Sequence, residues 1–204
     1  MARRRVVVTG LGIISPVGIG LPAAWSNIVA GKSGIGPITR FDASTFPTQI
    51  AGEVKDFNVA KWLSPKEARR FDTFIHFGLA AAIDALKDSG IDLDREPREQ
   101  VGVCIGSGIG GLPLIEDTHN AMLAGGMRKI SPFFVPGTII NLISGQLSIM
   151  YGLKGPNLAV VTACSTANHC IGEAGLLIEY GDADVMLAGG AEACTSPLGV
   201  GGFC

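Results

Sequence analysis

The residue best suited to chemistry is Cys164, which stands between two different sequence patterns. The apolar run 158–162 is rich in β-branched residues and is typical of a buried strand, whereas residues 165–180 have the spacing of a helix. The first N–H groups of a helix are unpaired and carry partial positive charge, and both effects favour a thiolate over a thiol. The pattern predicts a nucleophilic cysteine, with a buried structural cysteine as the alternative.

The elements that must hold this cysteine alternate between strands and helices. Short apolar runs predict strands at residues 5–10, 101–105, 158–162 and 185–188. Longer periodic segments predict helices at residues 21–30, 64–89, 114–123, 138–151 and 165–180. The strands are apolar throughout, as in a sheet covered on both faces. The order predicts an α/β fold with a mostly parallel sheet and helices on both faces.

Composition narrows the possible function classes. Hydrophobic residues make up 47% of the chain and charged residues 17%, so the protein either buries most of itself or presents an apolar face to a partner. No apolar run reaches the ~18 residues of a membrane span without a charge, glycine or proline. The formal net charge of −2 argues against bulk nucleic-acid binding. We therefore expect no membrane span and no nucleic-acid partner.

The remaining cysteines give little sign of metal or redox chemistry. The chain has five cysteines and no Cys-x-x-Cys pair, which disfavours a zinc site and thioredoxin-like chemistry. The N-terminus is basic and then apolar, but the apolar part is short and runs into Gly10 and Gly12, so we interpret it as a strand and a turn. We therefore predict a cytoplasmic protein with reduced cysteines, no metal and no cofactor.

Two glycine loops imitate a dinucleotide-binding fingerprint. Residues 106–111 read GSGIGG after a predicted strand, and residues 10–15 come close to the same pattern. A nucleotide site also requires an acidic residue about twenty positions on, at the end of the next strand, and neither loop has one. A nucleotide-binding oxidoreductase stays as a weaker alternative. The favoured interpretation is that these glycines let backbone pass close to other backbone or to a substrate.

Seven motifs together point to a known family. They are VVVTGLGIISPVG, GSGIGG, RKISPFFVP, YGLKGPN, VTACSTANH, YGDADVMLAGGAEA and PLGVGGF. In this order they resemble the β-ketoacyl–acyl-carrier-protein synthases, most of all the type II condensing enzymes of bacterial fatty-acid synthesis. The resemblance covers residues 4–203, essentially the whole chain.

The resemblance implies a fold, a reaction and partners. The fold is thiolase-like, with α-β-α-β-α layers, and this chain supplies about one half of it. The implied activity is that of an acyltransferase, a 3-oxoacyl-acyl-carrier-protein synthase that works without a cofactor. Cys164 accepts an acyl chain from acyl-carrier protein, and decarboxylative condensation with malonyl-carrier protein extends that chain. The backbone N–H of the same cysteine forms part of an oxyanion hole, and members of the family are homodimers.

The same resemblance implies roles for residues that line the acyl pocket. Ile109, in the second glycine loop, matches a position at the end of that pocket. Phe134 and Val135 match residues that reach toward the pocket of the partner subunit. Phe203 matches an aromatic residue beside the cysteine. The four side chains are therefore expected to bind substrate.

A basic patch is implied as the docking surface for the acidic carrier protein. Lys66, Arg69 and Arg70 match its central cluster, and Arg128 with Lys129 lie in a later loop able to extend it. A small cationic patch on a mildly acidic protein suits a transient acidic partner.

Residues 1–204 correspond to an N-terminal half-domain. In the family the C-terminal half carries two catalytic histidines, a lysine and a glycine-rich segment, and these lie outside this sequence. We interpret His169 as a packed helix histidine that points away from Cys164, and neither His76 nor His119 has the family motif around it. The chain alone is therefore predicted not to complete turnover. The alternative is a truncated, non-catalytic subunit that binds carrier protein or dimerises.

Glu192 is a single carboxylate among small residues in the segment AGGAEA. A part in catalysis is one explanation. The favoured interpretation is that its carboxylate accepts hydrogen bonds from backbone N–H groups, as carboxylates among small residues commonly do.

Overall fold

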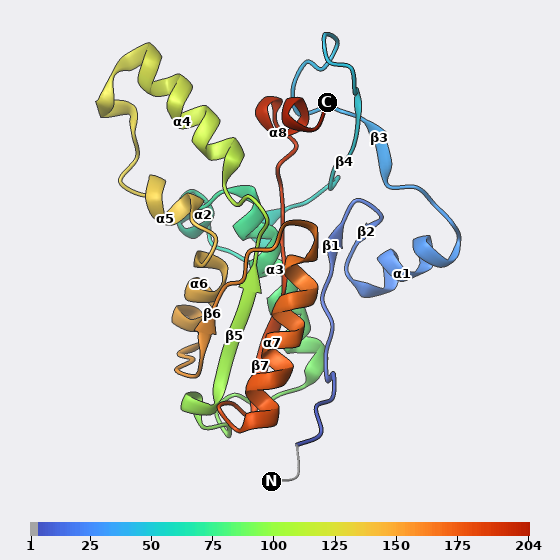
Figure 1. The fold of residues 1–204 in the computed structure, drawn as a ribbon, viewed down its shortest axis with the longest axis vertical. Coiled ribbons are helices and arrows are strands. Elements are labelled where there is room, and N and C mark those ends of the chain that lie inside the picture. Colours follow the sequence, from blue (N-terminus) through green and yellow to red (C-terminus); the bar gives the residue numbers. More distant parts are fainter. Residues whose placement is uncertain (1–3) are drawn as a thin grey trace.

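The computed structural model describes residues 4–204, and its centre is a three-stranded parallel sheet (Figure 1). The strands are β5 (Val101–Gly106), β6 (Asn157–Leu158) and β7 (Val185–Gly190), in the order β6-β5-β7. All six residues of β5 are buried, and β5 pairs with β7 along its whole length. The sheet confirms the predicted α/β class, and its strands end together at one edge.

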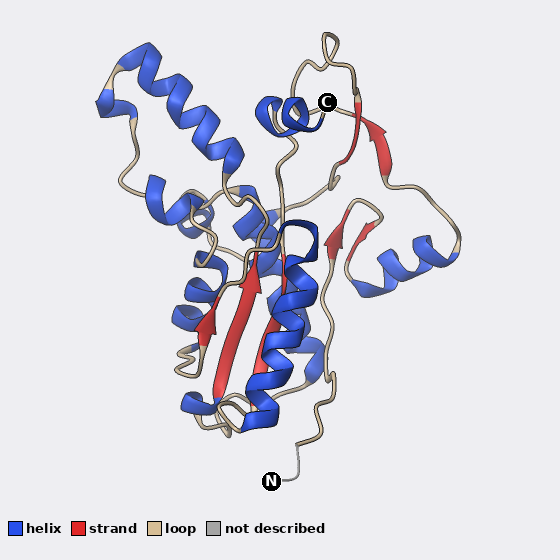
Figure 2. Ribbon diagram, in the orientation of Figure 1, coloured by secondary structure: helices blue, strands red, loops and turns tan. Residues whose placement is uncertain are grey.

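Helices cover both faces of this sheet (Figures 1 and 2). Val101, Val103 and Ile105 belong to the core that α3 (Thr73–Ser89) and α6 (Leu142–Tyr151) share. Between them in β5, Cys104 instead packs against α7 (Thr166–Tyr180). Side chains alternate between the two faces of a strand, so α3 and α6 lie on one face and α7 on the other. The result is a three-layer α-β-α body.

The remaining elements surround this body. Two small antiparallel sheets form between residues 14 and 52, and short helices connect the larger ones. They are β1 (Ile14–Ser15), β2 (Gly18–Ile19), α1 (Leu21–Val29), β3 (Ile35–Pro37), β4 (Ile50–Gly52), η1 (Val59–Lys61), α2 (Pro65–Ala68), η2 (Arg98–Gln100), α4 (Leu112–Gly125), η3 (Met127–Lys129), α5 (Phe134–Thr138), η4 (Ala163–Ser165) and α8 (Pro197–Phe203).

The strand predicted at Arg5–Gly10 is wrong. These residues form no ladder, and the Val8 residue is 77% exposed. The segment runs along a groove of about 390 Å³ that β7 and α7 also line, without pairing to β7. Valines favour an extended backbone locally, but a strand also needs hydrogen bonds to a neighbouring edge. The local preference was therefore predictable, and the missing pairing was not.

Residues 64–89 form two helices rather than the predicted single one. Ser64 and Glu67 make the capping box expected at the start of α2. That helix ends at Ala68, and Asp72 then caps a new helix, α3, by accepting a hydrogen bond from the backbone N–H of Phe74. A second strong N-cap within the sequence divides the segment, because its side chain competes with helical hydrogen bonding. The division leaves the residues of α2 near the surface.

Two further boundaries differ from prediction. The strand expected at 158–162 contributes only Asn157–Leu158 to the ladder, because beyond Leu158 the chain turns toward Cys164. The helix expected at 138–151 begins later, at Leu142, after the separate short helix α5. Both differences lie beside the carboxyl edge of the sheet, where the chain leaves regular structure.

None of the helices within residues 4–204 combines the length and the apolar character that crossing a bilayer requires. In the same range no three His, Cys, Asp or Glu side chains are grouped so as to hold a metal ion.

Candidate functional site

Cys164 lies in the tight turn η4, two residues before α7 begins. The turn is closed by a hydrogen bond from Ser165 N to Thr162 O (3.1 Å), and Thr162 N donates to Thr166 Oγ1 (2.9 Å). Ala163 has a φ of 51°, a left-handed conformation that costs an alanine on the order of 1–2 kcal/mol. The cysteine beside it is exposed. A strained turn therefore presents the sulfur-bearing residue to solvent instead of burying it.

This turn forms one wall of a cavity of about 340 Å³ at the carboxyl edge of the sheet. Ile109 and Phe203 line the same cavity as Cys164, although they are far apart in sequence. Phe203 comes from α8 and is 81% exposed. The other lining residues are Gly106, Ser107, Gly108, Ala163, Thr166, Ala167, Gly190, Ala191, Glu192 and Cys194. The cavity is open and mostly built from small or apolar residues, as a site for an acyl chain requires.

Phe134 and Val135 do not line this cavity. Both belong to α5, where Phe134 is half-buried and Val135 is 60% exposed. The short helix packs beside the second glycine loop, since Gly111 N donates to Thr138 O at 3.1 Å. The structure thus places these two side chains near the loop that carries Ile109, but outside the pocket of their own chain.

The basic residues occupy two separate places. Lys66 and Arg69 are exposed on or beside α2, and the Arg70 guanidinium lies 4.7 Å from the centre of the Phe133 ring. Arg128 and Lys129 are exposed in η3, at the far end of α4 (Figure 1). Leu114, at the start of α4, donates its N–H to Asp72, just before α3. Because α4 has 14 residues and is about 21 Å long, it separates the two groups.

Cys194 is a site residue that the sequence analysis took for core. It is half-buried and lines the cavity with Cys164. Burial raises the pKa of its thiol, and the nearby Glu192 charge raises it further, which keeps Cys194 protonated and weakly nucleophilic. Its position just after β7 was the available signal, because groups that follow parallel strands meet at one sheet edge.

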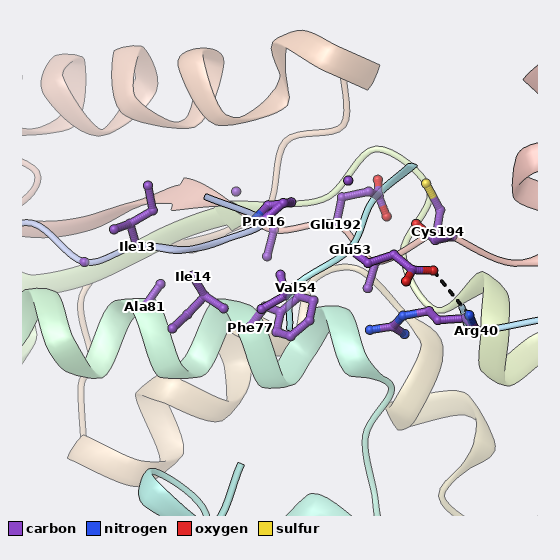
Figure 3. A pocket seen from close by; sticks show the side chains of 16 residues that line it. Ile13, Ile14, Pro16, Arg40, Glu53, Val54, Phe77, Ala81, Glu192 and Cys194 are labelled. Carbon is purple, nitrogen blue, oxygen red and sulfur yellow. Dashed lines mark hydrogen bonds between the residues drawn. The ribbon is translucent and has the colours of Figure 1, made fainter. Parts of the chain in front are cut away.

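Glu192 accepts hydrogen bonds from the loop that carries Ile109. Gly108 N and Ile109 N each donate to its Oε2 at 2.9 Å, and Ser107 Oγ donates to its Oε1 at 3.1 Å. The favoured sequence interpretation, a partner of backbone N–H groups, is confirmed. Glu192 and Cys194 also border a neighbouring pocket of about 360 Å³, shown in Figure 3.

The three histidines do not gather around Cys164. The prediction of a packed His169 is wrong, because the residue is exposed and its Nδ1 lies 2.6 Å from Thr162 Oγ1. It does not line the cavity of Cys164. His76 is half-buried and donates from Nε2 to Ala68 O at 2.8 Å, and His119 is exposed on α4.

The glycine loops are explained by close packing. A Cβ on Gly106 would meet Val160 O, and one on Gly108 would lie 3.4 Å from Ala163 Cα. The second loop therefore passes directly against the turn that holds Cys164. An exposed cysteine before a helix, at the carboxyl edge of a parallel sheet and beside an apolar cavity, defines a site for acyl transfer through a thioester.

Comparison with known proteins gives the family. The chain belongs to the β-ketoacyl synthase family, because the model "Beta-ketoacyl synthase, N-terminal domain" matches residues 3–204. It is 54% identical over 203 residues to 3-oxoacyl-(acyl-carrier-protein) synthase 2 of Coxiella burnetii, covering 100% of this chain and 49% of that protein. For the enzyme of the same name from Staphylococcus aureus strain COL the identity is 44% over 200 residues, covering 98% and 48%.

Solved structures show the same fold. One is a complex of a type II polyketide-synthase acyl-carrier protein with its ketosynthase bound to the hexaketide, with a TM-score of 0.83, 31% identity and coverage of 99% of this chain and 55% of that one. Another is the ishigamide ketosynthase/chain length factor, with a TM-score of 0.82, 32% identity and coverage of 94% and 48%. The predicted thiolase-like fold is confirmed. The chain spans about half the length of the curated relatives it matches.

Proposed function

We propose that residues 1–204 are the acyl-accepting, N-terminal half of a 3-oxoacyl-acyl-carrier-protein synthase of fatty-acid elongation. The observation that carries the proposal is the placement of Cys164, exposed on a strained turn before α7, in one cavity with Ile109 and Phe203. The match to the N-terminal domain of the β-ketoacyl synthases supports the same assignment.

The proposed chemistry has two steps and uses the sulfur twice. The Cys164 thiolate attacks the carbonyl carbon of an acyl-carrier thioester, a new C–S bond forms, and the carrier thiol leaves. Malonyl-carrier protein then loses CO2, and the resulting enolate attacks the acyl-cysteine carbonyl. The C–S bond breaks, the thiolate is regenerated, and the 3-oxoacyl chain leaves on its carrier. Sulfur suits both roles because it is a good nucleophile and a good leaving group.

Ile109 and Phe203 are proposed to contact the acyl chain. Both side chains are apolar and line the cavity that Cys164 opens into. Ile109 would limit the depth of the pocket and Phe203 would cover its mouth beside the sulfur. In a dimer, Phe134 and Val135 would reach the pocket of the second subunit, which agrees with their exclusion from the cavity of their own chain.

Acyl-carrier protein is the proposed partner, as the complex named above has for its own ketosynthase. Lys66, Arg69 and Arg70 form the proposed docking surface, and the exposure of the first two supports it. Arg128 and Lys129 would add contacts only for a carrier that reaches along α4. The protein is proposed to act as a homodimer in the cytoplasm, where the Cys164 thiol stays reduced.

Complete turnover is proposed to need a second half. None of the three histidines lines the cavity of Cys164, so no imidazole of this chain is placed there to polarise the malonyl thioester. Two histidines and a lysine from a C-terminal half would supply that function. The 204-residue chain alone is expected to accept an acyl group without forming a condensation product.

Acylation of Cys164 tests the first step. Incubation with palmitoyl-coenzyme A should add one acyl group, and peptide mapping should place it on Cys164 and not on the buried Cys104. Burial raises the pKa of the Cys104 thiol to about 12, so that group stays unreactive. Cys164→Ala should abolish the adduct, whereas Cys204→Ser should retain it. An adduct that persists in the Cys164→Ala protein would overturn the assignment.

Product formation tests the second step. The chain is joined to the C-terminal half of its Coxiella burnetii relative and supplied with acyl- and malonyl-carrier protein. The chimera should form 3-oxoacyl product, and the unjoined chain should not. A chimera that is acylated at Cys164 but makes no product would support the alternative, a non-catalytic carrier-binding subunit.

A further inference from the structure

We propose that Glu192 is a positioning residue that sets the acyl-chain preference at Cys164 by fixing the loop that carries Ile109. The inference rests on the proposed function, since it assumes that the cavity beside Cys164 receives an acyl chain. Its basis is a set of hydrogen bonds that connects two strand ends to one cavity wall.

The first part of the argument is where Glu192 stands. β5 and β7 are paired through Gly106 and Gly190, and Ala191 N adds a further hydrogen bond to Gly106 O at 3.0 Å. Glu192 is therefore the first residue beyond the last rung between the two strands. Its backbone position is fixed by the sheet, so its carboxylate is a rigid point from which to hold a neighbouring loop.

The second part is what the carboxylate holds. Its Oε2 accepts from Gly108 N and Ile109 N, and its Oε1 accepts from Ser107 Oγ. Ser107 Oγ in turn accepts from Gly110 N at 3.1 Å. Four consecutive residues, 107–110, are thus tied to one carboxylate, directly or through a buried serine. Successive backbone N–H groups that converge on an anion make a stable concave loop.

The third part is the link between this loop and the sulfur. A Cβ on Gly108 would lie 2.9 Å from Glu192 Oε2 and 3.4 Å from Ala163 Cα. The loop is therefore packed between the carboxylate and the turn that presents Cys164. Ile109 follows in the same loop and lines the cavity. If the carboxylate is lost, Ile109 loses the hydrogen bond that fixes its backbone, and the far wall of the cavity loses its fixed position.

The hydrogen bonds also argue against a part for Glu192 in proton transfer. Both carboxylate oxygens accept from donors that belong to the protein. An ionised carboxylate makes all three bonds, whereas a proton on either oxygen would replace an acceptor with a donor. Glu192 therefore acts through the loop and not on the reacting atoms.

The test compares Glu192→Ala with Glu192→Gln in the 204-residue chain. Second-order rates of Cys164 acylation are measured with octanoyl- and palmitoyl-coenzyme A, and the ratio of the two rates is the readout. In Glu192→Ala that ratio should change by about tenfold, because a wall displaced by about 1 Å affects a long and a short chain differently. Glu192→Gln keeps the length and one carbonyl acceptor, so its ratio should return to within about threefold of the wild type.

Two controls separate positioning from general damage. Glu53 is a matched carboxylate that accepts from Thr39 N, Thr39 Oγ1 and Arg40 N but does not line the cavity of Cys164. Glu53→Ala should lower the melting temperature and leave the chain-length ratio unchanged. Alkylation of Cys164 by iodoacetamide, a small reagent that needs no deep pocket, should change by less than about twofold in Glu192→Ala.

The outcomes distinguish this inference from the proposed function. A wild-type chain that is never acylated at Cys164 would contradict the proposed function itself. A chain that is acylated there, with the same octanoyl-to-palmitoyl ratio in the wild type and in folded Glu192→Ala, would overturn only the role of Glu192. A ratio altered equally by Glu192→Gln and Glu53→Ala would show a structural effect without positioning, and would also overturn it.

Discussion

The two glycine loops have similar sequences and follow similar apolar runs, yet they do different things. Gly10 and Gly12 follow the valines of the N-terminal segment and press against α3, where Leu11 N also donates to Asp88 Oδ2 at 2.8 Å. The loop of residues 106–111 follows β5 and is held by the carboxylate of Glu192 beside Cys164. The first loop contacts backbone and fixes packing, whereas the second contacts a side chain and shapes a cavity.

The comparison teaches that a glycine pattern reports only that something comes close. At Gly12 the close atoms are backbone atoms of a helix, with Ala85 N 2.8 Å from an added Cβ. At Gly108 the closest atom is the end of a flexible side chain, Glu192 Oε2 at 2.9 Å. The cost of adding a methyl group depends on which of these must move. The three predictions below test this distinction and the helix on which it depends.

Gly12→Ala should have the largest effect on stability. The new Cβ would overlap the backbone of α3 at Ala81, so the segment or the helix must shift, at a cost of about 3 kcal/mol. Urea unfolding followed by circular dichroism measures the loss. The matched control is Gly172→Ala in α7, where an added Cβ meets nothing within 4 Å, and a stability gain of about 0.5–1 kcal/mol is expected. Equal midpoints for the two variants would contradict the packing argument.

Gly108→Ala should have a smaller effect on stability and a larger one on the site. Because the Glu192 side chain can move aside, we expect a loss of about 1 kcal/mol. The displaced carboxylate would then hold Ile109 less well, so the octanoyl-to-palmitoyl acylation ratio should shift in the same direction as in Glu192→Ala. The same urea titration and acylation assay measure both quantities. A stability loss as large as that of Gly12→Ala would erase the distinction between the loops.

Much of the sheet was predictable because its signals are local. β5 and β7 are short apolar runs whose partners lie in the same chain, and the structure pairs them residue by residue. Arg5–Gly10 has the same signal and forms no ladder. Pairing depends on which edge is available at what distance, and a run of valines carries no information about that. The sequence pattern therefore predicts extended backbone more reliably than it predicts a strand.

The site was predictable in part. The switch from strand pattern to helix pattern marks Cys164 within the sequence itself, and the structure exposes it there. The left-handed conformation of Ala163 has no sequence signal, because an alanine rarely adopts it. The carboxylate of Glu192 was expected to accept from N–H groups, but those of Gly108 and Ile109 lie 84 and 83 residues away. Only the folded sheet brings such distant groups together.

The smallest of the three effects concerns α3, the helix against which the first loop packs. Burial lowers the pKa of His76 from 6.5, and the hydrogen bond to Ala68 O and the charge of Asp72 only partly oppose this shift. The folded state therefore favours the neutral ring. Its contribution to stability is present above pH 6.5 and is lost as the pH falls through the lower pKa of the folded state.

His76→Gln should therefore lose less stability on acidification than the wild type, since glutamine has no titrating ring and still offers an N–H to Ala68 O. Urea unfolding at about pH 7 and about pH 5 measures the difference. Burial raises the pKa of Asp72, so that carboxyl contributes with the opposite sign, and comparing the two proteins cancels it. The effect is small because a half-buried ring keeps part of its hydration. An equal or steeper loss in His76→Gln would show that another group carries the acid sensitivity of α3, and that the first loop rests on a helix held differently from the one described.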